Sequence, residues 1–270
     1  MFFKFKKKIS NKSFCEPKIF HLPPTSDFAR CFVDGFISKF EPKILDTNPE
    51  LVGHVTLLVS NKNLAKNIEE ILVSYGLVIL PKIIELEKLS EIFYEQVIKK
   101  NINKESQIHY RVISNLDRFL LLHDILQELE EQGFQKISKT NLFDLAHSLT
   151  SLVDELAINN LGSKHLKKLN DDELPKHLQL NLRLLQRVLN SYEKVIRKEK
   201  LIDEHSKYSI EVNELVNSWR LKLHSKPIVL VGSTGSIPST AKLMQAVSHL
   251  PQGFVVLPGL DPYLTFRAWN

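Results

Sequence analysis

The sequence predicts an α/β fold in which one parallel sheet is interrupted by a large all-helical insertion. The segment from Pro227 to Asp261 reads as strand, glycine-containing turn, helix and strand, which is a β-α-β unit. Residues 18–88 alternate strand and helix in the same manner. The residues between, from about Leu89 to Lys222, carry apolar stripes at helical spacing. Both flanking segments therefore contribute strands to the same sheet.

The N-terminal part is predicted to contain three short strands and two helices. Thr25, Ser26 or Asp27 can cap the first helix, and Asn61 or Asn63 can open the second. The predicted elements, in chain order, are a strand at 18–22, a helix at 28–40, a strand at 54–60, a helix at 61–72 and a strand at 77–80 that ends at Pro81.

The C-terminal β-α-β unit has two continuously apolar strands, Ile228–Val231 and Phe254–Leu257, as strands buried on both faces require. We expect Pro238 in the first turn of the intervening helix, with Ser236 or Ser239 as its cap.

The turn after the first of these strands resembles a phosphate-binding loop without its essential groups. Gly232, Ser233, Thr234 and Gly235 permit a sharp turn, but a phosphate-cradling loop also needs a lysine directly after its last glycine. The nearest lysine, Lys242, is expected further along on the helix. This segment therefore predicts a tight turn and no bound nucleotide.

The insertion is predicted to be helical throughout, with three core-facing apolar stripes. Asp203 is the expected N-cap of its last helix, with Ser206 three residues on. The stripes are Leu142, Leu145, Leu149, Leu152, Val153 and Leu156; Leu178, Leu182, Leu185, Leu189, Tyr192 and Ile196; and Val212, Leu215, Val216 and Trp219.

The charge balance is mildly basic, with a formal net charge of +5 and a pI of about 9.0, which suits a polyanionic partner. Basic residues recur in clusters along the insertion. The cluster of Lys194, Arg197, Lys198 and Lys200 is the candidate for contacts with a DNA backbone.

Several classes of protein are disfavoured by the sequence. The two cysteines, Cys15 and Cys31, form no CxxC pair, which argues against a disulfide scaffold or a metal centre and favours a reducing, cytoplasmic setting. No apolar run reaches the ~20 residues that span a bilayer. Residues 1–17 are rich in lysine and phenylalanine and are expected to be a basic disordered tail. We expect no catalytic residue, cofactor or metal.

Five segments in this order closely resemble one protein family: HLPPTSDF, VTLLVSNKNLAKNIEEIL, LPKIIEL, VGSTGSIPSTAKLMQAVSHLP and VVLPGLD. They are similar to the N-terminal part of AddB in its alphaproteobacterial form. AddB is the non-motor subunit of the AddAB helicase–nuclease, which resects double-strand DNA breaks for recombination. The resemblance covers nearly the whole chain after the tail.

The resemblance implies a RecA-like domain of the superfamily I helicase type that has lost its ATPase motifs. His21 to Asp27 then holds the place of the first phosphate loop, and it contains neither glycine nor lysine. AddB proteins are several times longer and end in a nuclease, so the resemblance also implies a truncated chain, either a fragment of a split or decaying gene or a region of a longer protein. Family activity is therefore not expected of this chain, only contacts with DNA or an AddA-like subunit.

Three other readings remain open at this level. The chain could be a Rossmann-like nucleotide-binding enzyme domain that uses Gly232–Thr240 at a helix N-terminus. It could be a helical protein-interaction module without DNA binding, or a non-functional gene fragment. The preferred division is a tail at 1–17, a helicase-like domain at 18–88 and 223–270, and a helical insertion at 89–222.

Overall fold

The computed structural model describes residues 16–23, 27–38, 50–94, 97, 110–133, 139–166, 175–221, 224 and 226–259. The chain divides into two compact units. The first comprises Met1–Asn101 and Glu211–Asn270, and the second comprises Ile102–Ile210. Residues 89–101 and 211–222, which the sequence analysis placed in the insertion, thus belong to the first unit. The predicted tail lies almost wholly outside the described residues.

The first unit is built on a five-stranded sheet in which every neighbouring pair of strands is parallel. The strand order is β1-β7-β6-β2-β3. The N-terminal and C-terminal segments interleave, since Leu58 of β2 pairs with Leu230 of β6 and Phe20 of β1 pairs with Val256 of β7. The predicted parallel α/β fold is therefore confirmed. The strands are β1 (Ile19–Leu22), β2 (Thr56–Val59), β3 (Lys82–Glu85), β6 (Ile228–Val231) and β7 (Gly253–Pro258).

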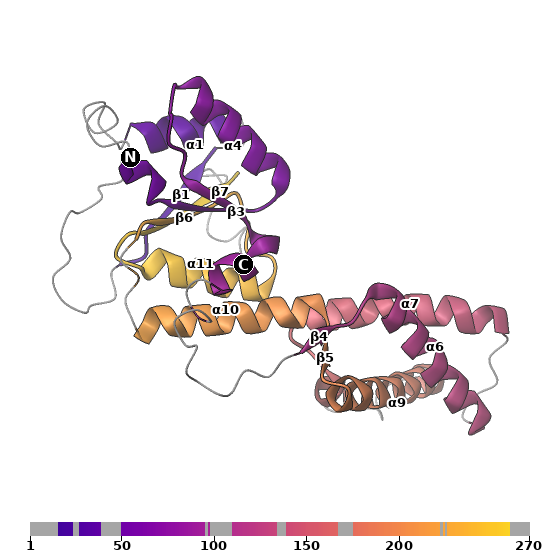
Figure 1. Ribbon diagram of the computed structural model, residues 1–270. Coiled ribbons are helices and arrows are strands. Elements are labelled where there is room, and N and C mark those ends of the chain that lie inside the picture. Colours follow the sequence, from indigo (N-terminus) through magenta and orange to yellow (C-terminus); the bar gives the residue numbers. More distant parts are fainter. Residues whose placement is uncertain are drawn as a thin grey trace. The chain divides into compact units, whose positions relative to one another are not determined.

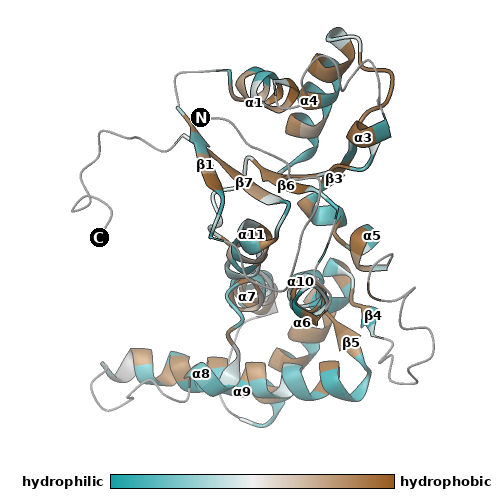
Figure 2. Cartoon of the chain, turned by 90° about the vertical axis from the view of Figure 1, so that its left-hand side faces the viewer, coloured by the Kyte–Doolittle hydropathy of each residue, from teal (hydrophilic) through white to brown (hydrophobic). Residues whose placement is uncertain are grey.

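Helices cover both faces of this sheet (Figure 1), with α1 and α4 on one face and α11 on the other. The core beneath α1 and α4 is apolar, and Val33, Ile68, Leu57 and Val231 are all fully buried in it. The central strand β6 is accordingly hydrophobic along its length (Figure 2). The helical elements of this unit are α1 (Phe28–Ile37), α3 (Glu50–Gly53), α4 (Lys62–Ser74), the 3₁₀ turn η1 (Leu86–Lys88), α5 (Ser90–Phe93), α11 (Pro238–His249) and the second half of α10 (Glu204–Leu221).

The strand predicted at Leu77–Leu80 is wrong, because the observed strand β3 begins only after Pro81. The chain leaves α4 through Gly76, which has φ 79°, and the Leu77 amide folds back to donate to the Leu72 carbonyl. Val78 is 93% exposed, unlike a residue of a buried strand. Regular pairing starts at Lys82, whose amide donates to Val55, since Pro81 has no N–H to offer a ladder.

Three of the predicted helix caps are confirmed by hydrogen bonds. The side chain of Asp27 accepts from the Arg30 amide of α1 at 3.2 Å, and that of Asn61 accepts from the Leu64 amide of α4 at 2.9 Å. The side chain of Asp203 accepts from Ser206 at the start of α10, at 2.7 Å. Thr25 and Ser26 lie outside the described residues.

The predicted cap of α11 is wrong. The N-cap is Ile237, and no side chain caps this helix. Pro238 holds the first helical position as predicted, which places Ser239 inside the first turn, where it is buried. The fixed backbone of Pro238 starts this helix without help from a serine at the cap.

The second unit consists of helices packed around one apolar core, plus a small sheet that the sequence analysis missed. Its core joins Leu122 and Leu126 of α6 with Leu149 of α7 and Leu189 of α9. The first predicted stripe lines this core together with Leu185, Leu189, Tyr192 and Ile196 of the second, whereas Leu178 is exposed. The elements are β4 (Arg111–Val112), α6 (Asn115–Glu131), α7 (Lys139–Ile158), α8 (Ser163–Leu166), α9 (Lys176–Lys198), β5 (Leu201–Ile202) and the first half of α10.

The short strands β4 and β5 pair in parallel, Arg111 with Leu201 and Val112 with Ile202, so the insertion is not helical throughout. The pairing brings together two segments far apart in the sequence, which no local pattern reveals. The third predicted stripe is buried on α10 as expected, with Trp219 only 3% exposed, but its residues belong to the first unit and not to the helical insertion.

Candidate nucleic-acid interface

The turn after β6 is a tightly packed piece of backbone. Gly232 and Gly235 have φ 78° and 71°, conformations that L side chains rarely adopt. A Cβ added to Gly232 would collide with the side chain of Leu64 and lie 3.3 Å from the Ser60 hydroxyl. Glycine is therefore required at residue 232 both by its backbone angle and by the space available.

This turn lies at the topological switch point of the sheet. The connection from β2 runs through α4 to β3, while that from β6 runs through α11 to β7 on the other side. In open parallel sheets such a point is the usual place for a ligand. Here the Ser60 amide donates to the Val231 carbonyl at 3.2 Å, and the Asn61 side chain already accepts from the first turn of α4. The N-terminus of α4 is thus capped by a side chain of the protein, whereas that of α11 has no side-chain cap.

Lys242 lies on α11 as expected, and its ammonium group donates to the Asn213 side chain on α10 at 2.6 Å. Its charge is directed to α10.

The structure gathers the four predicted DNA-contacting residues at the C-terminal end of α9. Lys194, Arg197 and Lys198 are exposed on the last turns of the helix, at spacings of three and four residues that put them on one face. Lys200 follows two residues after Lys198 and is also exposed, with φ 52°. Within the described residues, Lys198 makes a long, exposed ion pair with Glu199, at 3.9 Å. The four cations thus form one basic end.

The basic end continues along α9 through two arginines that the sequence analysis missed. Arg183 and Arg187 are exposed and lie four residues apart. At ~100° per residue, they share an arc of about 100° with Lys194, Arg197 and Lys198. The only acid of the helix, Glu193, falls outside that arc. We call Arg183, Arg187, Lys194, Arg197, Lys198 and the adjoining Lys200 the basic face of α9.

The sequence contained the signal for this face. Plotting α9 as a helix separates the cations from the apolar stripe of Leu182, Leu189 and Tyr192, which is buried. Figure 2 shows the same alternation of hydrophilic and hydrophobic residues along α9. A further cation, Arg111, could not be found this way. It is exposed on β4, and its amide donates to the Lys200 carbonyl at 3.0 Å.

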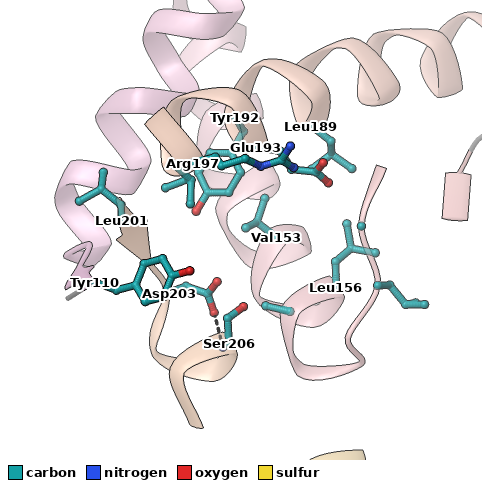
Figure 3. Close-up of a pocket in the computed structure, with 14 residues that line it drawn as sticks. Tyr110, Val153, Leu156, Leu189, Tyr192, Glu193, Arg197, Leu201, Asp203 and Ser206 are labelled. Atoms are coloured by element: carbon teal, nitrogen blue, oxygen red, sulfur yellow. Dashed lines mark hydrogen bonds between the residues drawn. The ribbon is translucent and has the colours of Figure 1, made fainter. Parts of the chain in front are cut away.

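On its apolar side, α9 forms one wall of a pocket of about 310 Å³ together with α7 and the start of α10. Figure 3 shows its lining, with Val153 and Leu156 from α7 and Leu189 and Tyr192 from α9. Arg197 belongs both to this lining and to the basic face. The pocket therefore opens next to the cations.

Two carboxylates and a buried hydroxyl give the pocket its polar character. Glu193 accepts from the Ser163 amide at 2.7 Å and from its hydroxyl at 2.8 Å, which fixes both oxygens. Tyr192 is 6% exposed, and its hydroxyl has no hydrogen-bond partner among the described residues. Burial, and then the Asp203 carboxylate, raise the pKa of Tyr192 to about 12, so this hydroxyl keeps its proton at neutral pH.

An ion pair with a buried arginine and a half-buried aspartate lies in the same unit. The guanidinium of Arg118 on α6 binds the Asp154 carboxylate of α7 at 2.6 and 2.9 Å, and also the Asn115 side chain at 3.0 Å. Arg118 is 4% exposed. The pair joins two core helices.

Within the described part of the chain, no three histidine, cysteine or acidic side chains gather as metal ligands, and no helix is long and apolar enough to cross a membrane. No model of a protein family matches the chain, and no curated protein matches it significantly.

Proposed function

We propose that this chain is a non-catalytic, AddB-like region of a double-strand break repair protein, which contacts the DNA backbone in the cytoplasm. The observation that carries the proposal is the basic face of α9, whose cations lie on one arc without an acid. Lysine and arginine side chains of this kind neutralise phosphates without reading sequence.

The length of the basic face suits such a role. At 1.5 Å per residue, Arg183 and Lys198 lie about 22 Å apart along α9, a distance that covers several phosphates of a strand. The face is mounted on a helix whose opposite side is buried in the core of the helical unit. The cations are therefore presented by a rigid support.

The α/β unit supports the comparison with an inactivated helicase domain. Its sheet is parallel, as a RecA-like fold requires, and the segment after β6 is a packed glycine turn with no lysine. The missing lysine after Gly235 favours this proposal over the nucleotide-binding alternative. On this proposal an AddA-like motor–nuclease subunit supplies the chemistry, and the present chain supplies contacts.

The test compares two variants that each remove four positive charges. The first changes Lys194, Arg197 and Lys198 to Gln and Lys200 to Asn, which tolerates the left-handed backbone of that position. The control changes Arg30, Lys62, Lys66 and Lys226 to Gln; all four are exposed in the α/β unit.

Fluorescence anisotropy at low salt on two duplexes of unrelated sequence gives the readout. We expect equal affinity for both duplexes, at least a tenfold loss for the α9 variant and little change for the control. A strong preference for one duplex would contradict backbone-only contact. Equal losses in the two variants would show that net charge, and not the basic face, determines binding.

A further inference from the structure

We propose that the pocket beneath the basic face of α9 binds an unpaired nucleobase. The base comes either from a free nucleoside or from a DNA strand whose phosphates lie on that face. Only the second source rests on the proposed function, because the pocket itself is formed wholly by residues of the helical unit.

The size of the pocket limits the ligand to a small ring system. Its volume of about 310 Å³ is at the lower end of the range of about 300–1,000 Å³ that small-molecule sites occupy. Val153, Leu156 and Leu189 give it apolar walls, which suit the faces of a planar ring.

The polar groups select a ligand with a hydrogen-bond acceptor and a donor. The Tyr192 hydroxyl keeps its proton, lies buried in the wall of the pocket and donates to no described residue, so a ligand that displaces the wall slightly can supply the acceptor that it needs. Asp203 uses one carboxylate oxygen to cap α10 through Ser206, and its other oxygen can accept from a ligand. In Figure 3 the hydroxyl groups of Tyr192 and Tyr110 are both drawn on the side of Asp203.

Nucleobases match this pattern better than simpler ligands. Their pairing edges carry donors next to acceptors, and proteins that take a base out of the stack read that edge with hydrogen bonds while apolar or aromatic side chains hold the ring. An inorganic anion would face the Asp203 carboxylate, and a hydrocarbon would leave the Tyr192 hydroxyl without a partner.

The rim of the pocket connects it to the basic face. Tyr110 is exposed at the rim and offers an aromatic ring on which a base can stack. Arg197 lines the same rim and carries one of the cations of the basic face. A strand that follows those cations therefore passes the opening, where an unpaired base can turn in.

The experiment uses the full chain and two probes. One probe is a labelled single strand, compared by anisotropy with the same strand carrying abasic sites. The other is a set of free nucleosides, followed by saturation-transfer NMR. Tyr192→Phe removes the hydroxyl and keeps the ring. Ala157→Leu fills the pocket from α7 and leaves the tyrosine hydroxyl in the chain. Tyr94→Phe, at an exposed tyrosine outside the pocket, is the control.

We expect the intact strand to bind about three- to tenfold more tightly than the abasic strand, the size of one good hydrogen bond. Both pocket variants should bind the intact and the abasic strand with equal affinity, and the control should keep the difference in affinity. If the strands bind equally but nucleosides bind and lose binding in Tyr192→Phe, the pocket serves free nucleosides.

Two results would overturn the inference: no base-dependent margin together with no nucleoside binding, or a margin that both pocket variants leave intact. If no strand binds at any salt concentration, the proposed function fails, and the nucleoside measurement alone decides the pocket. Failure of the nucleobase pocket and failure of the proposed function thus give different results.

Discussion

Replacing Trp219 with alanine tests the packing of α10 in the α/β unit. The indole is 3% exposed, next to the fully buried Leu215 and Val216, and its ring centroid lies 5.9 Å from that of His224. Truncating a buried aromatic costs about 3–5 kcal/mol. Trp219 also lines a groove of about 510 Å³ between α10 and α11, so its truncation enlarges a space that already exists instead of opening a new cavity. We therefore expect a loss in the free energy of unfolding at the lower end of this range, about 3 kcal/mol.

The loss should lower the melting temperature by about 6–12 °C for a chain of this size. Circular dichroism is the suitable assay, because the substitution removes one of the two tryptophans that fluorescence would report. Trp219→Phe, which keeps an aromatic ring in place, should lower the melting temperature clearly less. A shift of only one or two degrees in the alanine variant would refute the reasoning and show that the indole contributes little to packing.

Three further predictions concern the ion pair, the buried tyrosine and the glycine turn. Asp154→Asn leaves Arg118 buried without its counter-charge and should cost about 3 kcal/mol in urea unfolding, while Arg118→Met with Asp154→Leu should recover most of it. The raised pKa of Tyr192, about 12 against an ordinary 10.0, means that the unfolded chain loses this proton first. The free energy of unfolding should therefore fall between about pH 10 and 12, by up to about 1.4 kcal/mol per pH unit, and less steeply in Tyr192→Phe. Calorimetry with Mg-ATP should show no micromolar binding; a micromolar Kd that weakened on Gly235→Val would contradict this.

The sheet was predictable because its strands carry a strong local signal. Ile228–Val231 and Phe254–Leu257 are continuously apolar, as burial on both faces demands, and both were found where predicted. The caps at Asp27, Asn61 and Asp203 were equally local, since each depends on one side chain and an amide three residues on.

The errors arose where the outcome depends on distant partners. Leu77–Leu80 has the composition of a strand, but the partner strand β2 pairs with Lys82–Glu85 instead. The β4–β5 pair joins Arg111 and Leu201 across most of the helical unit and leaves no local trace. The isolated hydroxyl of Tyr192 likewise exists only after three helices have packed around it.

Part of the candidate site could be predicted from the sequence. Lys194, Arg197, Lys198 and Lys200 stood out as a dense cluster in the sequence. The arginines further up α9 are separated by apolar residues and join the cluster only when the helical period is applied. Arg111 joins it through the pairing of β4 with β5.

The salt dependence of duplex binding tests the central claim most directly. If the basic face contacts three or four phosphates, log affinity should fall against log salt with a slope of about −3 to −4. The α9 variant should lose about 0.9 of slope for each lost contact, and the charge-matched control should keep the slope of the wild type. A slope that is the same in the α9 variant and the wild type, or an affinity unaffected by salt, would contradict the account.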